Sequence, residues 1–154
     1  MRINADFELC SILESEFDDS FDVVYAKEFI SHVHPVPQFI KVALKYLKSG
    51  GYIIISDTNP LNPLTRYLAY KEHRKGLYKI VKNPVTGSNV LYAVERLISP
   101  YTLIQLLRSN GFFVVDVSFY VWPGPSALLP LIKIIEEPLK FPITPIYTIT
   151  AIKV

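Results

Sequence analysis

Two apolar runs separated by an amphipathic segment constrain the fold of this chain more than any other feature. Residues 21–26, FDVVYA, lack the alternation of a half-exposed strand and predict a strand buried on both faces, and residues 52–56, YIIIS, predict a second buried strand. Residues 37–48 carry apolar side chains on one helical face and lysines on the other, and Gly50 and Gly51 predict a left-handed stop. The order strand, helix, strand predicts two parallel strands joined by a right-handed crossover.

Weaker patterns extend the prediction over the rest of the chain. Residues 2–9 alternate apolar and polar side chains, as a strand near a sheet edge does. Ser99 and Pro100 are residue types that begin helices, and Gly111 ends the helix that they predict. The strand expected next should have one wholly apolar face, formed by Phe113, Val115, Val117, Phe119 and Val121. The other elements expected are helices near 64–74 and 126–137, an irregular basic stretch containing Pro84 and Gly87, and a final strand at 145–153.

The composition indicates one globular domain over residues 1–154. Half of the residues are hydrophobic and 19% are charged, which excludes a disordered chain, and the net charge of +2 requires no polyanionic partner. A single cysteine, Cys10, excludes an internal disulfide and a cysteine-rich metal site, so no metal is expected. The longest apolar stretches, such as 126–135, are too short to span a bilayer, and no apolar run follows Met1. We therefore expect a cytoplasmic protein without a membrane segment.

Charge is distributed unevenly along the chain. Residues 1–28 contain eight acids, whereas residues 66–83 contain six lysines and arginines and one glutamate, a net charge of +5. One interpretation is a pair of solvated faces; the other is a basic rim that meets an anionic substrate or partner. Tyrosines interleave with this basic segment, and such residues can line a substrate lid, bind nucleic acid by stacking, or belong to an ordinary surface. They are Tyr67, Tyr70, Tyr78 and Tyr92.

Three segments resemble one known family in the order and spacing of their motifs. FDVVYAKEFISHVHPVPQFIKVALKYLKSGGYIIISDTNPLNPLTRYL is similar to the middle of class I S-adenosylmethionine (SAM)-dependent methyltransferases, with Ser49 where the family has proline before its double glycine. RLISPYTLIQLLRSNGFFVVDVSFY and IYTITAIKV resemble the later helix and last strands of the family. The resemblance covers about residues 21–154. It implies a truncated Rossmann-like α/β sheet, mostly parallel with an antiparallel C-terminal strand, and helices on both faces.

The resemblance also implies SAM as the cofactor and suggests which residues contact it. The family holds SAM mainly with an earlier Gly-x-Gly-x-Gly loop, and none of the six glycines here forms Gly-x-Gly. The family's adenine-binding acid corresponds to Cys10, which is a poor acceptor, and Ser11 beside it is an alternative. Backbone near Ala26, between Tyr25 and Lys27, corresponds to the contact with the amino acid part of the cofactor.

Candidate catalytic and substrate residues follow the two predicted strands. His32 corresponds to a histidine that the family places near cofactor or substrate, and an imidazole can act as a general base; the alternative is a turn residue that packs on the next helix. Asp57, a second catalytic candidate, lies with Thr58 and Asn59 at the carboxyl end of a strand, where α/β sheets bind ligands; the alternative is loop capping. The candidate substrate residues are Thr58, Asn59, Arg66 and Tyr67.

Three functions are compatible with these features. The first is a minimal or shortened SAM-dependent methyltransferase that transfers a methyl group to a small-molecule or macromolecular acceptor, with the SAM site at the tips of strands 21–26 and 52–57. The second is a degenerate methyltransferase-like domain that acts as a binding or regulatory partner, and the third is a nucleic-acid-binding accessory. Without a glycine-loop strand beside it, strand 21–26 would be an exposed apolar edge. We therefore expect residues 2–9, a second copy in a homodimer, or a partner chain to cover it.

Overall fold

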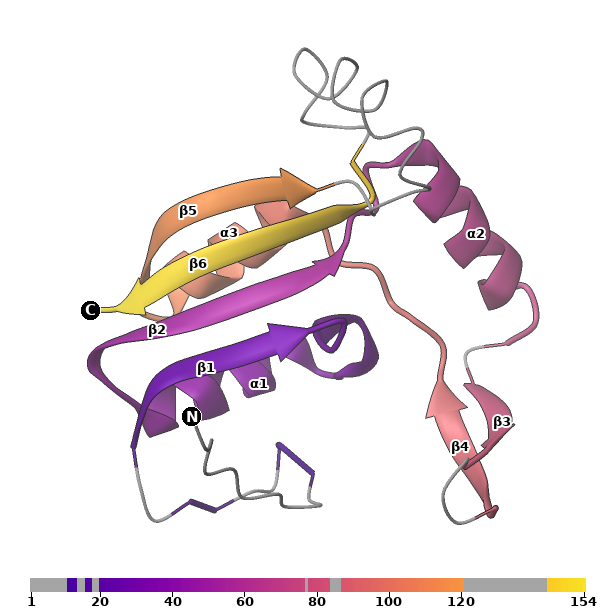
Figure 1. The fold of residues 1–154 in the computed structure, drawn as a ribbon, viewed down its shortest axis with the longest axis horizontal. Helices are drawn as coiled ribbons and strands as arrows, with labels where there is room; N and C mark the ends of the chain where they lie inside the picture. The colour runs from indigo at the N-terminus through magenta and orange to yellow at the C-terminus, as the bar shows by residue number, and fades with distance from the viewer. Residues whose placement is uncertain (1–10, 14–15, 18–19, 77, 84–86, 121–143) are drawn as a thin grey trace, which may run out of the picture.

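A four-stranded mixed sheet forms the centre of the fold (Figure 1). The computed structural model describes residues 11–13, 16–17, 20–76, 78–83, 87–120 and 144–154. The predicted strand at 2–9, Cys10 and the predicted helix near 126–137 therefore lie outside the described residues. In spatial order, the strands are β1 (Phe21–Lys27), β2 (Leu47–Thr58), β6 (Ile146–Lys153) and β5 (Phe112–Tyr120). The other elements are the 3₁₀ turn η1 (Ile30–His32), α1 (Val36–Tyr46), α2 (Pro63–His73), α3 (Pro100–Ser109) and the hairpin of β3 (Tyr78–Lys82) and β4 (Asn89–Ala93).

The strand directions confirm the predicted fold class. β1 and β2 are parallel, with Val24 opposite Ile53 and Ala26 opposite Ile55, and α1 connects them. β6 runs antiparallel to both β2 and β5, so β5 has the same direction as β1 and β2. The result is an α/β sheet with one reversed strand, the C-terminal one, as expected.

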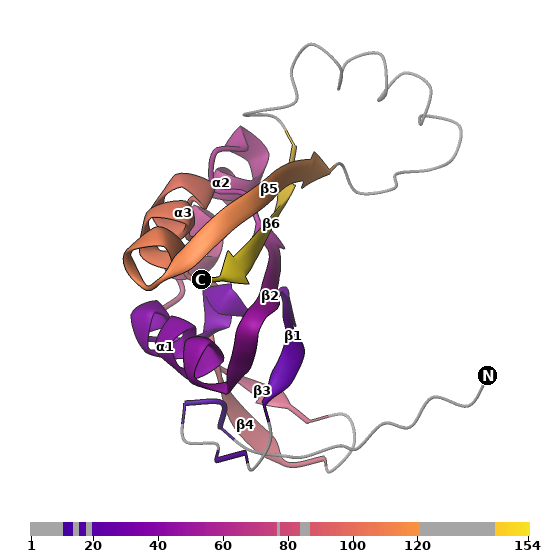
Figure 2. The ribbon, with the colours of Figure 1, turned by 90° about the vertical axis from the view of Figure 1, so that its left-hand side faces the viewer.

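The core lies between one face of the sheet and two helices. Figure 2 shows α1 and α3 on the same face, and the two helices contact each other. Ile40 and Ala43 of α1 and Leu103 and Leu107 of α3 are buried there. They pack in one cluster with buried sheet residues, among them Ile53, Ile55, Tyr147, Ile149 and Ala151. The sequence predicted helices on both faces of the sheet. In the described residues, the helices that pack on the core lie on this one face.

The prediction that β1 is buried on both faces is wrong. Val23 and Tyr25 are 49% and 61% exposed, and Ala26 is the one fully buried residue of the strand. β1 is the last strand in the described sheet, and Figure 2 shows α1 and α3 on one face of that sheet. Hydrophobic composition therefore identified the strand, but its burial depends on the helices, which in the described residues cover only one face of the sheet.

A bulge divides the apolar face predicted for β5. Phe113 and Val115 are exposed, whereas Val117 and Phe119 pack against the core. The register of β5 against β6 shifts between Val114 and Asp116. One extra residue in a strand reverses the direction of every side chain after it, so a single apolar face became two half-faces.

The end of α1 also differs from the prediction. The helix stops at Tyr46, before the double glycine, and β2 starts at Leu47. Lys153 from the C-terminal strand donates hydrogen bonds from Nζ to the carbonyl oxygens of Leu44 (2.8 Å) and Leu47 (2.6 Å). These bonds satisfy carbonyl groups that the end of a helix leaves free. Gly50, with φ of 75°, belongs instead to the turn within β2 where the register with β1 shifts.

The helices predicted near 64–74 and after Ser99 are confirmed. Asn62 Oδ1 accepts a hydrogen bond from Thr65 N (2.8 Å) at the start of α2, and Ser99 Oγ accepts one from Thr102 N (3.1 Å) at the start of α3. The stretch predicted to be irregular contains the β3–β4 hairpin instead. In the described part of the chain, every helix is too short or too polar to cross a bilayer.

Tyr147 makes the stability of the fold sensitive to alkaline pH. Burial raises the pKa of its phenol above the ordinary value, with Asp57 contributing, and its hydroxyl donates to the carbonyl oxygen of Ile98 (3.1 Å). Because the pKa of Tyr147 is raised in the folded state, the free energy of unfolding does not change below about pH 10. Above about pH 10 it falls by about 1.4 kcal/mol per pH unit. Tyr147→Phe should cost about 1 kcal/mol at pH 8, through the lost hydrogen bond. Urea unfolding should show that this difference in stability has disappeared at pH 11, where the wild type has lost about 1.4 kcal/mol; an unchanged difference would contradict the prediction.

Candidate functional site

The carboxyl ends of β1 and β2 are joined by a buried carboxylate. Asp57 is 1% exposed and accepts hydrogen bonds from the main-chain N–H of Ser31 (3.0 Å) and of Thr58 (2.7 Å). The N–H of Glu28 donates to the carbonyl oxygen of Ser56 (2.8 Å). Asp57 therefore fixes η1, which carries His32, against the end of β2. This contact is of the loop-capping kind; a catalytic role for Asp57 stays a prediction.

Asn59 is placed where a substrate cannot reach it. Its side chain is fully buried; Nδ2 donates to the carbonyl oxygen of Thr144 (2.9 Å), and Oδ1 accepts from Leu61 N (3.0 Å). Its own N–H donates to the carbonyl oxygen of Pro145 (2.7 Å). These bonds tie the loop after β2 to the start of β6. The substrate contact predicted for Asn59 does not agree with this burial.

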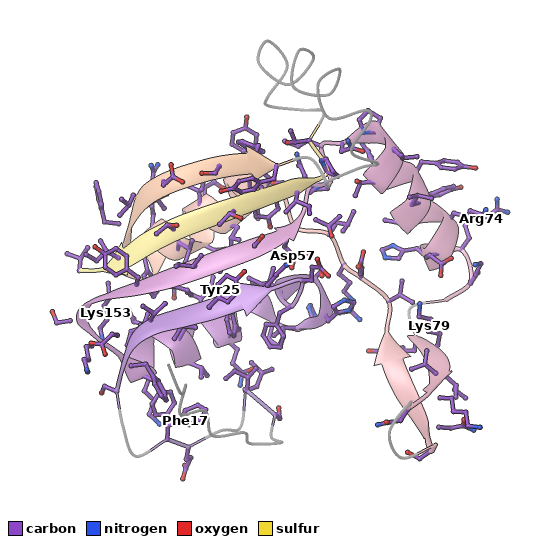
Figure 3. All side chains as sticks on the ribbon, in the orientation of Figure 1. Phe17, Tyr25, Asp57, Arg74, Lys79 and Lys153 are labelled. Atoms are coloured by element: carbon purple, nitrogen blue, oxygen red, sulfur yellow. The ribbon has the colours of Figure 1, made fainter. Side chains whose placement is uncertain are left out.

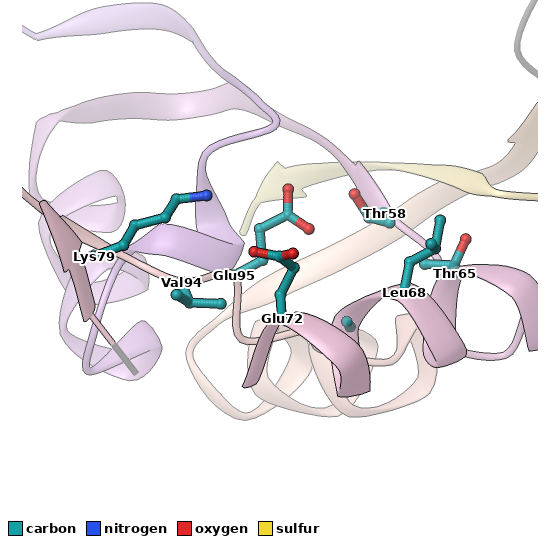
Figure 4. Close-up of a pocket in the computed structure, with 8 residues that line it drawn as sticks. Thr58, Thr65, Leu68, Glu72, Lys79, Val94 and Glu95 are labelled. Atoms are coloured by element: carbon teal, nitrogen blue, oxygen red, sulfur yellow. The ribbon is translucent and has the colours of Figure 1, made fainter. Parts of the chain in front are cut away.

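A cavity opens beside Thr58, the last residue of β2. Its volume is about 360 Å³, and Figure 4 shows the side chains around it. They come from the end of β2, from α2, from β3 and from the segment after β4, and they are Thr58, Thr65, Leu68, Ala69, Glu72, Lys79, Val94 and Glu95. We call this space the Glu95 cavity. Thr58 therefore lines a cavity at the strand end, and its contact with a substrate stays a prediction.

Two carboxylates and an ammonium group meet in the Glu95 cavity (Figure 4). Lys75 donates to Oε1 of Glu72 (2.7 Å), and this hydrogen bond lowers the pKa of Glu72, with smaller contributions from Lys79 and Lys71. Figure 3 shows Lys79 on the β3–β4 hairpin and Asp57 near the end of β2. The cavity therefore contains charges of both signs, and the carboxylate of Glu72 is already paired with Lys75.

Glu95 lies next to His32. The Nε2 of His32 is 3.9 Å from Oε1 of Glu95. The N–H of Arg96 donates to the carbonyl oxygen of Ser31 (2.8 Å), and the ring of His73 contacts the carbonyl oxygen of Glu95 through Nε2. The segment after β4 is thus held between η1 and α2, and His32 reaches the edge of the cavity through Glu95.

The other predicted residues lie apart from this cavity. Arg66 and Tyr67 are exposed on a different face of α2, where they line a shallow hollow of about 410 Å³ with Tyr70. A second hollow, about 430 Å³, includes Arg66, Tyr70 and His73. The structure therefore does not bring Arg66 and Tyr67 together with Thr58.

The described cofactor candidates do not line the cavities above. Tyr25 is exposed, Ala26 is buried, and Lys27 and Ser11 are exposed, whereas Cys10 lies outside the described residues. None of the three cavities described above includes them. Among the described residues, no group of three or more His, Cys, Asp or Glu side chains is placed to hold a metal ion.

Sequence reasoning missed Glu72 and Glu95 as site residues, and it identified Lys79 only as part of the basic segment 66–83. Glu72 lies four residues after Leu68 on the predicted helix, so its shared face with Leu68 was available from helical spacing. Lys79 and Glu95 had no such signal, because the β3–β4 hairpin that carries them to the cavity was not predicted.

Comparisons with known proteins agree on one family. A family model described as a methyltransferase domain matches residues 2–96. Phosphoethanolamine N-methyltransferase 1 of Arabidopsis thaliana is 31% identical over 77 residues, which cover 48% of this chain and 16% of that protein. The human mitochondrial ubiquinone biosynthesis O-methyltransferase is 29% identical over 114 residues, 73% of this chain and 29% of that protein. The chain thus spans less than a third of these relatives.

Solved structures share the fold. An S-adenosylmethionine-dependent methyltransferase from Mesorhizobium loti has a TM-score of 0.60 at 16% identity, over 95% of this chain and 68% of that chain. A SAM-dependent methyltransferase from Methanosarcina mazei has a TM-score of 0.60 at 18% identity, over 98% of this chain and 68% of that chain. About a third of each of these folds has no counterpart in residues 1–154.

Proposed function

This chain belongs to the methyltransferase domain family, and on that premise we propose that it supports SAM-dependent methyl transfer to an acceptor bound in the Glu95 cavity. The position of this cavity carries the proposal. It opens at Thr58, the carboxyl end of a parallel strand, where sheets of this type bind their ligands. His32 and Glu95 stand at its edge, so a proton acceptor lies beside the space for the acceptor molecule.

The described residues fit one end of SAM. The amino acid part of SAM carries an ammonium and a carboxylate, and the tip of β1 presents the exposed, oppositely charged Lys27 and Glu28. In the turn that follows, the hydroxyl oxygen of Ser31 is buried without a hydrogen-bond partner among the described residues. Such a group is available to form a hydrogen bond with a ligand. Lys27 and Glu28 would hold the amino acid end. For the adenosine end, the chain lacks a Gly-x-Gly loop.

The chemistry requires mainly positioning. When bound, SAM supplies a methyl group on a positively charged sulfur, and displacement from it needs an acceptor held in line. The residues of this chain orient the acceptor through the Glu95 cavity and provide His32 to take a proton from it. A cytoplasmic location of the protein stays a prediction from the sequence.

Calorimetric titration with S-adenosylhomocysteine, the demethylated form of SAM, tests the proposal directly. We expect binding with a dissociation constant on the order of micromolar, and a weaker affinity for Glu28→Gln, which removes the expected partner of the ammonium. Lys48→Gln serves as a matched control, because Lys48 is exposed and pairs with Asp22 at the other end of β1. Absence of heat at millimolar ligand would instead favour the second candidate, a degenerate domain that binds a partner. The missing glycine loop is the observation behind that candidate.

We further propose that β1 pairs with β1 of a second copy. Its outer edge has no partner among the described strands, and Val23 and Tyr25 are exposed along it. Antiparallel pairing about a two-fold axis at Val24 would place Val23 opposite Tyr25 of the copy, a favourable combination of β-branched and aromatic residues. Light scattering on the calorimetry sample should give a dimer mass; a monomer mass would exclude the second copy and leave residues 2–9 or a partner chain to cover the strand.

A further inference from the structure

Two hollows along α2 adjoin each other and form one groove. The hollow of about 410 Å³ and the hollow of about 430 Å³ share Leu61, Arg66 and Tyr70 as lining residues, and Tyr67 also lines the first. We call this combined space the Arg66 groove. Its lining has only Ala69 in common with that of the Glu95 cavity. The groove is therefore a second space beside α2, distinct from the one in which the acceptor was placed.

Two tyrosine rings line the groove and remain largely exposed. Tyr67 and Tyr70 are 60% and 61% exposed, and α2 buries none of its residues. The contacts between aromatic rings in the described part of the chain involve neither of them. A ring in this position presents a flat apolar face that a ligand can cover. The groove therefore offers stacking surfaces that the described residues do not use.

Positive charge surrounds these rings. Arg66 lines the groove, and Lys71 and Arg74 are exposed at the C-terminal end of the same helix, where Figure 3 shows Arg74. Residues 66–83 contain one acid, Glu72, which is already paired with a neighbouring lysine. The ion pairs of the described residues do not include Arg66. The local net charge of +5 therefore favours a ligand that carries several negative charges.

A single-stranded nucleic acid matches this combination of groups better than other polyanions do. Tyrosine rings stack on unpaired bases, and a guanidinium binds phosphate oxygens through two N–H groups. A duplex holds its bases in its own stack, so they would not reach the rings. An anionic lipid surface would bury exposed aliphatic side chains, but the exposed leucines of α2, Leu64 and Leu68, do not line the groove.

We propose that the Arg66 groove binds single-stranded nucleic acid, with bases stacked on Tyr67 and Tyr70 and a phosphate at Arg66. Lys71 and Arg74 would contact further phosphates along the same helix. The inference does not depend on methyl transfer, because the groove and the Glu95 cavity are lined by different residues apart from Ala69. Binding can therefore be measured without any cofactor.

Fluorescence anisotropy with the whole chain and a labelled oligothymidylate of about 12 nucleotides tests the inference. About three phosphate contacts give a slope of about −2 for log affinity against log salt concentration, so affinity should fall about 20-fold between roughly 50 and 200 mM salt. Tyr67→Ala and Tyr70→Ala should each weaken binding about fivefold or more and leave the slope unchanged. Arg66→Gln should reduce the magnitude of the slope by about 0.7.

Tyr101→Ala and Arg108→Gln are the matched controls, because both residues are exposed on α3 and neither lines the groove. Both variants should bind the oligonucleotide as the wild type does. Absence of binding at the lower salt concentration would overturn the inference, and so would equal affinity for a duplex of the same length or affinity that survives both tyrosine substitutions. Binding to phosphatidylglycerol vesicles that Arg66→Gln weakens, without binding to the oligonucleotide, would assign the groove to a lipid surface instead.

Discussion

Gly51→Ala is expected to destabilise the fold by about 2–3 kcal/mol, the range for forcing an extra methyl group into packed structure. A β-carbon at position 51 would lie 2.9 Å from the carbonyl oxygen of Lys48 and 3.1 Å from that of Asp22. It would also lie 3.1 Å from a methyl carbon of Leu47. Two of these three neighbours are backbone atoms, one within β2 itself and one in β1, so relief requires the backbone to shift.

Gly50→Ala provides the matched comparison for this prediction. Gly50 has φ of 75°, and a β-carbon there would meet no atom within 4 Å. Its substitution should lower the free energy of unfolding by about 1 kcal/mol. Strain from the left-handed backbone conformation destabilises the variant, and the lower entropy of its unfolded chain offsets part of that loss. Urea unfolding of both variants measures the difference. Equal losses would show that conformation rather than close packing makes glycine necessary at this junction.

Asp57→Ala is expected to lower the free energy of unfolding by about 3 kcal/mol. Hydrogen bonds to a charged acceptor contribute about 1.5–3 kcal/mol each, and the substitution would leave the donors of these bonds without a partner. The N–H of Ser31 is buried, and water cannot readily replace the carboxylate there. The loss should also release η1 from β2. Amide NMR signals of residues 30–32 should therefore shift and broaden in this variant.

Asp22→Ala is the control for the buried aspartate. The Asp22 carboxylate also makes two contacts, with Lys48 Nζ at 2.9 and 3.0 Å, but it is exposed. Exposed ion pairs contribute about 0.2–1 kcal/mol, so this variant should be nearly as stable as the wild type. A similar, small loss for both aspartates in chemical denaturation would mean that Asp57 does not hold η1 as inferred.

Some parts of the candidate site could be predicted and others could not. Thr58 ends β2 and His32 lies in the turn after β1, and the rule that ligands bind at the carboxyl ends of parallel strands led to both; in the structure Thr58 lines the cavity and His32 lies beside Glu95. Asn59 satisfied the same rule and is fully buried, because Thr144 and Pro145 from the far end of the chain occupy its polar groups. Proximity in sequence thus located the region, and distant residues decided which side chains face the cavity.

The sequence by itself determined the elements whose causes are local. Apolar runs, helical spacing and caps within three residues, such as Ser99 with Thr102, specify the strand–helix–strand unit and the start of α3, and their order implies a mixed α/β sheet. Only the tertiary structure decided the exposure of β1, the end of α1 and the assembly of the Glu95 cavity. Lys153, which caps α1, lies 109 residues after Leu44 in the sequence. Thr58 and Glu95 line the same cavity, and the hairpin that separates them in the sequence was not predicted. The physical reason is range: a local pattern encodes conformation, whereas burial and site geometry depend on which distant segments pack beside it.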